Sequence, residues 1–451
     1  MSETLWIRQP LAVYTGIDDD ASGGVVVRDG RIVETLSAGQ QPTTTDHQIF
    51  DASEHVLLPG LINAHHHFYQ TLTRAFPPAI NKRLFPWLQT LYPVWARLSE
   101  KQLALASRLA MTELLMSGCT TASDHHYLFT DALGEAIDVQ FQEAASLGMR
   151  VVLTRGSMSL GQDQGGLPPN STVQTEDAIL ADSERLVARY HQPGEGAMQQ
   201  IALAPCSPFS VSRELMRDTA TLARQLGVRL HTHLAETADE NAFCEREFGL
   251  RPLDYLDDCG WLAGDVWLAH GIHFDDSELT RLGAAGTGIC HCPSSNMILA
   301  SGICRGMELE AAGAAVGLGV DGSASNDGSN MIGEVRQALL IHRLRYDADD
   351  VTHLDALRWA TRGSARCLGR DDIGSIAVGK QADLALFRLD ELRFSGAGDP
   401  LAALILCGAQ QADAVMVGGQ WRVRDGQPID VDLAALRAQH QVAAQQLHEL
   451  V

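Results

Sequence analysis

Histidines recur in this sequence in pairs that are separated by a single residue. His65 and His67 flank His66 in one run, and His231 precedes His233 in another. Successive side chains of a strand point to opposite faces, so the two members of each pair share a face. Two imidazoles on one face can bind a divalent ion, although the first run alone could equally form a hydrogen-bonded polar cluster. We take His65 and His67 as candidate metal ligands, because His66 points the other way.

Two carboxylates complete a possible metal site around the second pair. His233 lies nearer the end of its predicted strand than His231, so we expect His233 to be the ligand and His231 to lie deeper. Asp321 follows an apolar run of small residues, where it could be a ligand, a base or a helix cap. Three histidines and an aspartate, with one position left for water, form a catalytic metal site. Glu236, in the loop after His233, is then placed to shuttle protons.

A fold that gathers these residues must end several strands at one edge. Eight short apolar runs alternate with helical patterns, as parallel β/α units require. The runs are 56–67, 120–126, 150–156, 201–205, 228–233, 266–270, 288–292 and 315–321. They end at or next to His67, His126, Arg155, Cys206, His233, His270, His291 and Asp321. Because a β/α barrel has its active site at the carboxyl ends of its strands, we predict an α/β fold, an eight-stranded TIM-type barrel.

The barrel would occupy residues 57–372, with a smaller domain built from both ends of the chain. Residues 1–56 and 373–451 contain short alternating strands with turn signals, such as the hairpin dipeptide Asp29-Gly30. These strands could pair into one β-sandwich and bring the termini together. A final helix is expected over 433–450.

Composition limits the partners of the chain. The formal net charge is −22 over 451 residues, which argues against nucleic acid and anionic membranes. The sequence contains no run of 18 or more apolar residues, the length that would be needed to span a bilayer. The nine cysteines are odd in number and scattered, as is typical of reduced thiols in a cytoplasmic protein. The spacing of Cys290-His291-Cys292 does not match a structural zinc site. The run that follows it, Pro293 to Asn296, is expected to line or support the pocket.

Several segments together resemble the amidohydrolase superfamily. They are 58–67, 231–237, 269–271, 291–296, 319–322, 363–366 and 379–383. The similarity is to the branch of cytosine, guanine, adenosylhomocysteine and chlorotriazine hydrolases. It implies one metal ion on His65, His67, His233 and Asp321, proton transfer by Glu236 and His270, and a homo-oligomer. Two-metal relatives use a lysine on the fourth strand, but the three lysines here are Lys82, Lys101 and Lys380.

A finer similarity points to the group of 8-oxoguanine deaminases. It rests on segments 65–74, 123–129, 153–159 and 204–210. The chain has Cys206 where the adenosylhomocysteine branch has a histidine, and it lacks a glutamate in 85–95, where that branch holds a ribose. The resemblance implies hydrolytic deamination of a free purine-type base, with 8-oxoguanine giving urate and ammonia. Guanine, isoguanine, a pterin or an s-triazine are the alternatives. A metal-free scaffold or a two-ion hydrolase of cyclic amides fits the ligand set and the lysines less well.

The substrate pocket is expected to recognise a flat, polar, uncharged ring. Gln70 offers a donor and an acceptor, Arg155 could bind a carbonyl oxygen, and Cys206 and Glu236 lie at predicted strand ends or loops. The aromatic candidates for stacking are Trp87, Trp95, Tyr127 and Phe209, although for each of them core packing is favoured over contact with substrate. Imidazole and carboxylate ligands suit zinc first and iron(II) as an alternative.

Overall fold

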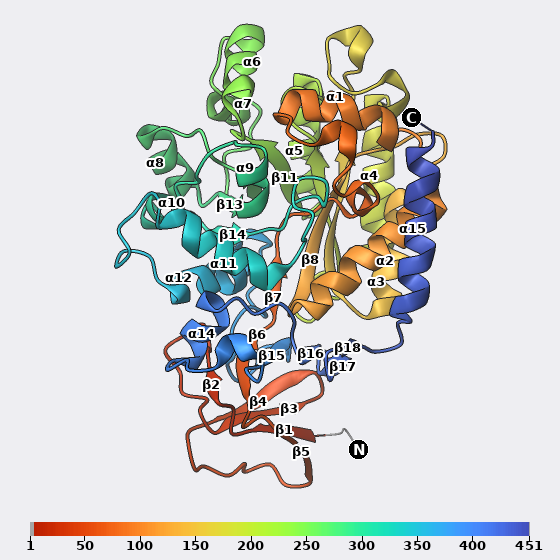
Figure 1. The fold of residues 1–451 in the computed structure, drawn as a ribbon. Coiled ribbons are helices and arrows are strands. Elements are labelled where there is room, and N and C mark those ends of the chain that lie inside the picture. Colours follow the sequence, from red (N-terminus) through yellow and green to blue (C-terminus); the bar gives the residue numbers. More distant parts are fainter. Residues whose placement is uncertain (1–3, 451) are drawn as a thin grey trace.

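Eight parallel strands form the central sheet of the computed structural model, which describes residues 4–450 (Figure 1). They are β7 (Leu61–Asn63), β8 (Cys119–His126), β9 (Arg150–Ser157), β10 (Gln199–Pro205), β11 (Arg229–Leu234), β12 (Val266–His270), β13 (Gly288–His291) and β14 (Val316–Leu318). Neighbours in the sheet follow chain order. The two edge strands meet where the amide of Ala64 donates to the carbonyl of Leu318 at 2.9 Å. The sheet is therefore a barrel, and the predicted fold class is confirmed.

Helices cover the outside of the barrel, between successive strands (Figure 1). They are α2 (Glu100–Met116), α3 (Ala136–Leu147), α4 (Glu176–Tyr190), α5 (Arg213–Leu226), α6 (Ala238–Phe248), α7 (Pro252–Asp258), α8 (Asp276–Ala285), α9 (Pro293–Ile298), α10 (Gly306–Ala311), α11 (Met331–His342), α12 (His353–Arg358), the π-helical η5 (Trp359–Gly363) and α13 (Ser364–Cys367). The hydroxyl of Ser212 caps the start of α5 by accepting from the amide of Leu215. α3 ends at Gly148, which adopts φ +63°, the left-handed conformation that commonly ends a helix.

The first predicted strand, 56–67, is divided between two sheets. Its first part is β6 (His55–Pro59), which pairs with a strand from the other end of the chain, and its second part is β7. Gly60 separates them, and a Cβ there would lie 2.1 Å from the Thr120 hydroxyl. The run of three histidines therefore follows the end of β7 rather than lying within a long strand.

Strands from both ends of the chain build the small domain as two packed sheets (Figure 1). One sheet contains β1 (Thr4–Arg8), β3 (Gly24–Arg28), β4 (Arg31–Leu36) and β5 (His47–Asp51). The other contains β2 (Ala12–Val13), β6, β15 (Leu384–Arg388), β16 (Ala414–Val417), β17 (Gln420–Arg424) and β18 (Gln427–Pro428). Ile7 and Val25 of the first sheet belong to the same buried apolar cluster as Leu57 and Leu384 of the second. The predicted Asp29-Gly30 hairpin joins β3 to β4.

The final helix does not stay with the small domain. α15 (Leu433–His448) runs along the barrel beside α2, and its last turn reaches η1 (Phe68–Thr73) (Figure 1). There His440 Nε2 lies 3.0 Å from the Thr71 hydroxyl, and His448 Nε2 donates to the carbonyl of Leu72 at 2.8 Å. The expectation that the two ends of the chain meet is therefore wrong for this helix.

The remaining elements are short, apart from one helix at the top of the barrel in Figure 1. That helix is α1 (Leu84–Trp95). The others are η2 (Pro77–Ala79), η3 (Gln162–Gln164), η4 (Asn170–Thr172), η6 (Leu392–Phe394) and α14 (Pro400–Leu406). Within residues 4–450, no helix has both the length and the apolar character that crossing a membrane would need.

A buried ion pair joins the small domain to the barrel. Arg150, at the start of β9, donates to both carboxylate oxygens of Asp383, at 2.8 and 3.0 Å. The side chains are 0% and 2% exposed, and Asp383 also accepts from the amide of Gly418. Removal of one partner from such a pair leaves the other charge buried without compensation.

We expect Asp383→Ala to lower the free energy of unfolding by about 3–5 kcal/mol, the usual cost of an orphaned buried charge. Urea denaturation followed by circular dichroism measures the change. The control is Glu195→Ala, because Glu195 pairs across the same domain boundary with Arg31 but both side chains are exposed. That variant should lose no more than about 1 kcal/mol. Equal losses in the two variants would contradict the assignment.

Candidate metal centre and active site

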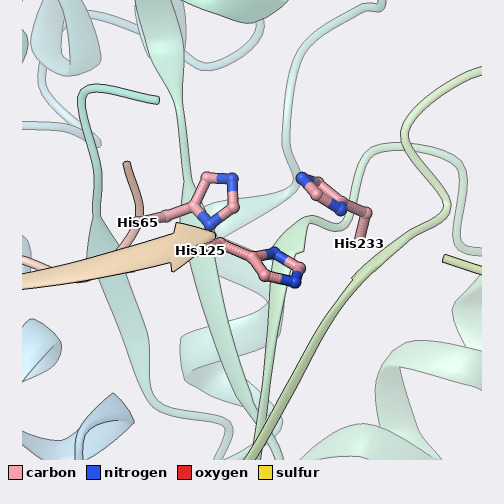
Figure 2. A group of neighbouring side chains, drawn as sticks. All are labelled: His65, His125 and His233. Atoms are coloured by element: carbon pink, nitrogen blue, oxygen red, sulfur yellow. The ribbon is translucent and has the colours of Figure 1, made fainter. Parts of the chain in front are cut away.

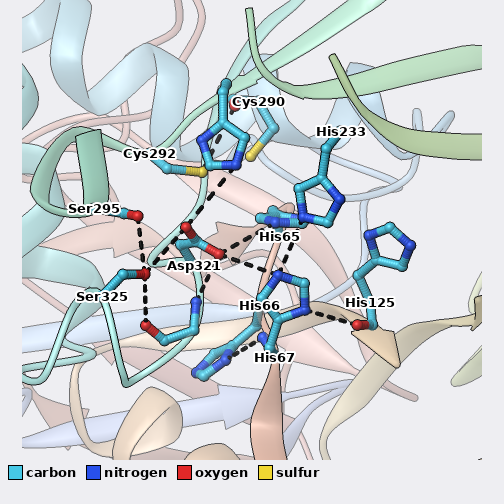
Figure 3. A network of polar contacts seen from close by, with 12 residues as sticks. His65, His66, His67, His125, His233, Cys290, Cys292, Ser295, Asp321 and Ser325 are labelled. Carbon is cyan, nitrogen blue, oxygen red and sulfur yellow. Dashed lines mark hydrogen bonds and ion pairs between the residues drawn. The ribbon is translucent and has the colours of Figure 1, made fainter. Parts of the chain in front are cut away.

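Four side chains from strands far apart in the sequence converge at the mouth of the barrel. His65 Nε2 and His67 Nε2 each lie 3.3 Å from the same oxygen of Asp321, Oδ1 (Figure 3). His233 Nε2 lies 3.2 Å from His67 Nε2. All four residues are buried. The predicted ligand set is thus brought together, whereas the Nδ1 of His66 accepts from the amide of His67 and is turned away.

Hydrogen bonds behind the imidazoles determine which ring nitrogens carry protons. His231 Nδ1 lies 2.8 Å from the carbonyl of Trp267, which can only accept, so this nitrogen is protonated and His231 Nε2 is bare. His231 Nε2 in turn lies 2.8 Å from His65 Nδ1, which must donate to it. His65 therefore presents a bare Nε2 towards Asp321. From the deeper position that the sequence predicts, His231 orients the ring of His65.

The other two histidines are oriented by backbone carbonyls in the same way. His67 Nδ1 donates to the carbonyl of His125 at 2.7 Å, and His233 Nδ1 donates to the carbonyl of Cys206 at 2.6 Å. Each ring therefore directs Nε2 at the cluster, as the nitrogen available to a metal ion.

These residues fit a divalent ion well. Burial holds the pKa of His65 well below its ordinary value and lowers the pKa of His233 to about 3, so both rings are neutral. Burial alone would raise the pKa of Asp321, but the neighbouring imidazoles of His65 and His67 keep it well below the ordinary value. Burial alone would lower the pKa of His67, but Asp321 raises it, so an ion that bound here would replace a proton on that ring. Three imidazoles and one carboxylate oxygen around a common point are the donors of a catalytic metal site.

The structure adds His125, which the sequence analysis did not single out, to this cluster. Ligand nitrogens of His65, His125 and His233 lie within 4.8 Å of one another (Figure 2). The His125 ring stacks on His233 with centroids 4.7 Å apart, and its Nε2 lies 2.9 Å from the carbonyl of Ala204. Alternation along β8 requires that either His125 or His126 faces inward, but the sequence alone does not show which.

A pocket opens above the ligand cluster, with about 390 Å³ of empty space, its mouth included. Five residues of its wall come from η1 and α1, and the rest come from strand ends and loops. The lining residues are His67, Gln70, Leu84, Trp87, Leu88, Tyr92, Tyr127, Cys206, Phe209, His233, Glu236, His270, Leu299, Asp321 and Ser325. The wall therefore contains no lysine or arginine.

Glu236 and His270 face each other beside Asp321. His270 Nε2 lies 3.6 Å from Glu236 Oε2 and 4.0 Å from Asp321 Oδ2. Burial, followed by the charge of Asp321, raises the pKa of Glu236 to about 8. Burial lowers the pKa of His270. A carboxyl group that can exchange a proton near neutral pH and a neutral imidazole therefore border the same space.

A second buried carboxylate holds the turn that carries Glu236. Glu240, in the first turn of α6, accepts from the amides of Ala235 and Glu236 at 3.0 and 2.9 Å. Ala235 has a φ of +53°, in the left-handed region that non-glycine residues rarely adopt. The two bonds from Glu240 stabilise this conformation and so direct Glu236 into the pocket.

The structure corrects the role expected of Arg155. Its guanidinium points outward from β9, pairs with Asp182 at 2.9 Å and donates to Gln174. It also lies 3.9 Å from the centre of the Phe129 ring, so it does not reach the pocket. Side chains on a strand alternate, and the side chain at position 155 falls on the outer face.

Other expected strand-end and stacking residues divide between pocket and core. His126 Nε2 is bonded to the carbonyl of Leu128, and Trp95 packs against Tyr69 and donates to Thr73. Neither lines the pocket, in contrast to the other expected residues Gln70, Cys206, Trp87, Tyr127 and Phe209. The wall also contains Tyr92 and Ser325, which no motif indicated.

Comparisons with known proteins agree with this geometry. The model of one family, described as the amidohydrolase family, matches residues 56–422. An 8-oxoguanine deaminase of Pseudomonas aeruginosa is 67% identical over 447 residues, which cover 99% of each chain. An isoxanthopterin deaminase of an unknown prokaryotic organism is 36% identical over 92% of this chain and 91% of its own.

A solved structure also has the same fold throughout. It is the atrazine chlorohydrolase of Arthrobacter aurescens TC1 in complex with zinc, which is 31% identical. The superposition has a TM-score of 0.91 and covers 98% of this chain and 100% of the other. Together with the His and Asp cluster, this similarity supports a divalent metal ion at the mouth of the barrel.

The orientation of His65 by His231 predicts a measurable effect on metal affinity. His231→Phe keeps a ring stacked on Trp267 but removes the acceptor for His65 Nδ1. We expect metal to bind about 10- to 100-fold more weakly, as is usual when the partner of a ligating histidine is lost. Competition with a chromophoric chelator measures the affinity. His126→Phe, a buried ring outside the cluster, is the control, and an unchanged affinity in His231→Phe would refute the role.

Proposed function

Since the chain belongs to the amidohydrolase family, we propose that it catalyses hydrolytic deamination of 8-oxoguanine to urate and ammonia. The observation that carries this proposal is the similarity to an 8-oxoguanine deaminase, 67% identical over 99% of both chains. The alternatives are other aminated heterocycles, because relatives at about half that identity carry names of deaminases for a pterin and for adenosine derivatives.

Apart from the metal-ligand cluster and Glu236, the polar groups of the pocket wall are uncharged, which suits a neutral base. Burial raises the pKa of the Tyr127 hydroxyl well above its ordinary value and that of the Cys206 thiol to about 12. Gln70 Oε1 accepts from the amide of Ala324 at 3.3 Å, so its Nε2 hydrogens are the part that a carbonyl oxygen of the base would meet. We propose Gln70 and Cys206 as substrate contacts, together with Glu236, and add Tyr127 to them.

The part of the wall that α1 supplies favours a base without a sugar. Its pocket residues are Leu84, Trp87, Leu88 and Tyr92, and α1 contains no carboxylate that could hold ribose hydroxyls. Trp87 and Phe209, each about 5% exposed, add apolar rings to this wall rather than groups that would bind a sugar.

We propose His65, His67, His233 and Asp321 as the ligands of one zinc ion. When bound, the ion supplies a Lewis acid that allows water to lose a proton near neutral pH. Three imidazoles and a carboxylate suit zinc, and the similar atrazine chlorohydrolase was solved with zinc. Iron(II) is the alternative that this ligand chemistry leaves open.

The protons of the reaction would pass between Glu236, His270 and the base. His270 Nε2 and Asp321 Oδ2 border the space in which the attacking water would lie, and both can accept its proton. Glu236 would deliver a proton to the ring nitrogen next to C2, the carbon that bears the amino group. The water oxygen would add to C2, and the C2–N bond would then break as the amino group takes the remaining hydrogen of that water and leaves as ammonia. One water is consumed for each urate formed.

Ammonia release from a panel of aminated rings tests the substrate. We expect 8-oxoguanine to have the highest kcat/KM, ahead of guanine, isoguanine, isoxanthopterin and an aminated s-triazine. Guanosine should be a poor substrate, because α1 offers no carboxylate to hold the hydroxyls of a ribose. A pterin or triazine that exceeded 8-oxoguanine, or no release from any purine, would overturn the proposal.

Glu236→Gln separates proton transfer from metal binding. We expect the variant to retain about one zinc ion per chain by elemental analysis, but to lose about 10²- to 10⁴-fold in kcat, the usual contribution of a general acid–base. Asp321→Asn should lose metal as well as turnover. The matched control is Glu247→Gln, an exposed carboxylate on α6. Near-normal turnover of Glu236→Gln would remove Glu236 from the mechanism.

A further inference from the structure

We propose that Asn296 and His291 are positioning residues that hold His270 in the tautomer with a proton on Nδ1 and a bare Nε2. Asn296 belongs to the run from Pro293 that was expected to line or support the pocket, and His291 is the last residue of β13. Neither lines the pocket, yet both are at most 1% exposed and connected to His270 by hydrogen bonds. The inference rests on the proposed role of His270 as a proton acceptor.

The Asn296 amide bridges two imidazoles with opposite ends. Its Oδ1 lies 3.1 Å from His270 Nδ1, and its Nδ2 lies 3.2 Å from His291 Nδ1. An amide oxygen only accepts and an amide nitrogen only donates. His270 Nδ1 must therefore carry a proton, and His291 Nδ1 must be bare. If the amide turned over, both tautomers would reverse together, so the orientation of Asn296 decides where the proton of His270 lies.

The surroundings of His291 favour one orientation of that amide. Its ring packs edge to face with His342, with centroids 5.0 Å apart. His342 Nδ1 donates to the carbonyl of Ala338 at 2.8 Å, one turn earlier in α11, so His342 Nε2 is bare. His342 therefore offers no proton to His291, and His291 is free to carry its own proton on Nε2. That leaves His291 Nδ1 as the acceptor that the Asn296 amide needs.

Burial keeps this chain of groups neutral. The pKa of His291 is well below its ordinary value and that of His342 is lowered to about 4, in both cases by burial. A neutral imidazole has one donor and one acceptor nitrogen. The two hydrogen bonds of the Asn296 amide therefore set the proton positions of His270 and His291.

The consequence for His270 is that its bare nitrogen faces the reaction. With the proton on Nδ1, the lone pair of Nε2 points towards Glu236 Oε2 and Asp321 Oδ2, at 3.6 and 4.0 Å. Only this tautomer can accept a proton from water between these groups. The other tautomer would direct an N–H from Nε2 into this space, so Nε2 could not accept a proton there.

The experiment is a two-bond ¹H–¹⁵N correlation spectrum of the zinc-loaded enzyme labelled with ¹⁵N-histidine, recorded without substrate. Protonated and bare ring nitrogens have well-separated ¹⁵N shifts, and the signals of His270 and His291 are assigned by their loss in His270→Gln and His291→Phe. We expect the proton on Nδ1 of His270 and on Nε2 of His291. A proton on Nε2 of His270 in the unaltered enzyme overturns the proposal, whether or not 8-oxoguanine proves to be the substrate.

Two variants test the cause. Asn296→Leu removes both bonds, and we expect His270 to show both tautomers and kcat to fall about 10- to 100-fold with little change in KM. His291→Phe keeps the ring against His342 but removes the acceptor for Asn296, so mixed tautomers of His270 are expected again. If Asn296→Leu does not fold, His291→Phe alone tests whether the Asn296 amide fixes the tautomer of His270.

Ser301→Ala is the control for local packing, because Ser301 donates its amide to the Asn296 carbonyl but its hydroxyl has no hydrogen-bond partner among residues 4–450. It should keep the tautomer and the turnover of the unaltered enzyme. A single Nδ1-protonated His270 in both Asn296→Leu and His291→Phe would show that something else fixes the ring, and would refute the proposal.

Discussion

The seam at which the first and last strands of the barrel meet is the constraint on which the site depends. The amide of Ala64 donates to Leu318, the amide of Asp321 donates to the carbonyl of His65 at 3.1 Å, and the Asn63 side chain accepts from Val320 at 2.9 Å. These bonds set the register between chain segments more than 250 residues apart. They place Asp321, with a φ of +61°, against His65 and His67, so closing the barrel and assembling three of the four proposed ligands are one event.

Backbone carbonyls recur as the outermost partners of the site histidines. His67 and His233 donate directly to carbonyls of neighbouring strands, and His65 does so through His231. A carbonyl can neither titrate nor reverse its role, so it fixes an imidazole more firmly than a second titratable side chain would. The rigidity of the sheet is thereby passed to the nitrogens that would hold the metal, whereas the proposed partner of His270 is the side-chain amide of Asn296.

The sequence was most informative where chemistry and periodicity agreed. The spacing of His65 and His67, the position of His233 near a strand end and the Asp after a run of small residues sufficed to identify side chains that the fold brings within about 3.3 Å. The sequence was less informative about which face of a strand, inner or outer, a side chain occupies. Arg155 and His126 end strands as His233 does, but they point outward, because alternation predicts that neighbours differ without saying which one is inside. The break at Gly60 and the docking of α15 depend on tertiary contacts that no local pattern contains.

The docking of α15 makes the two ends of the protein unequal as points of attachment. The last turn of this helix is bonded to Leu72 in η1, two residues beyond Gln70 of the pocket wall, whereas β1 lies in the small domain at the opposite end of the molecule (Figure 1). A surface, fusion partner or affinity label attached after α15 would exert force on a helix whose hydrogen bond to Leu72 supports the pocket wall. One joined ahead of β1 would be separated from the pocket by the whole length of the barrel, so immobilised or fused forms of the protein are best designed from that end.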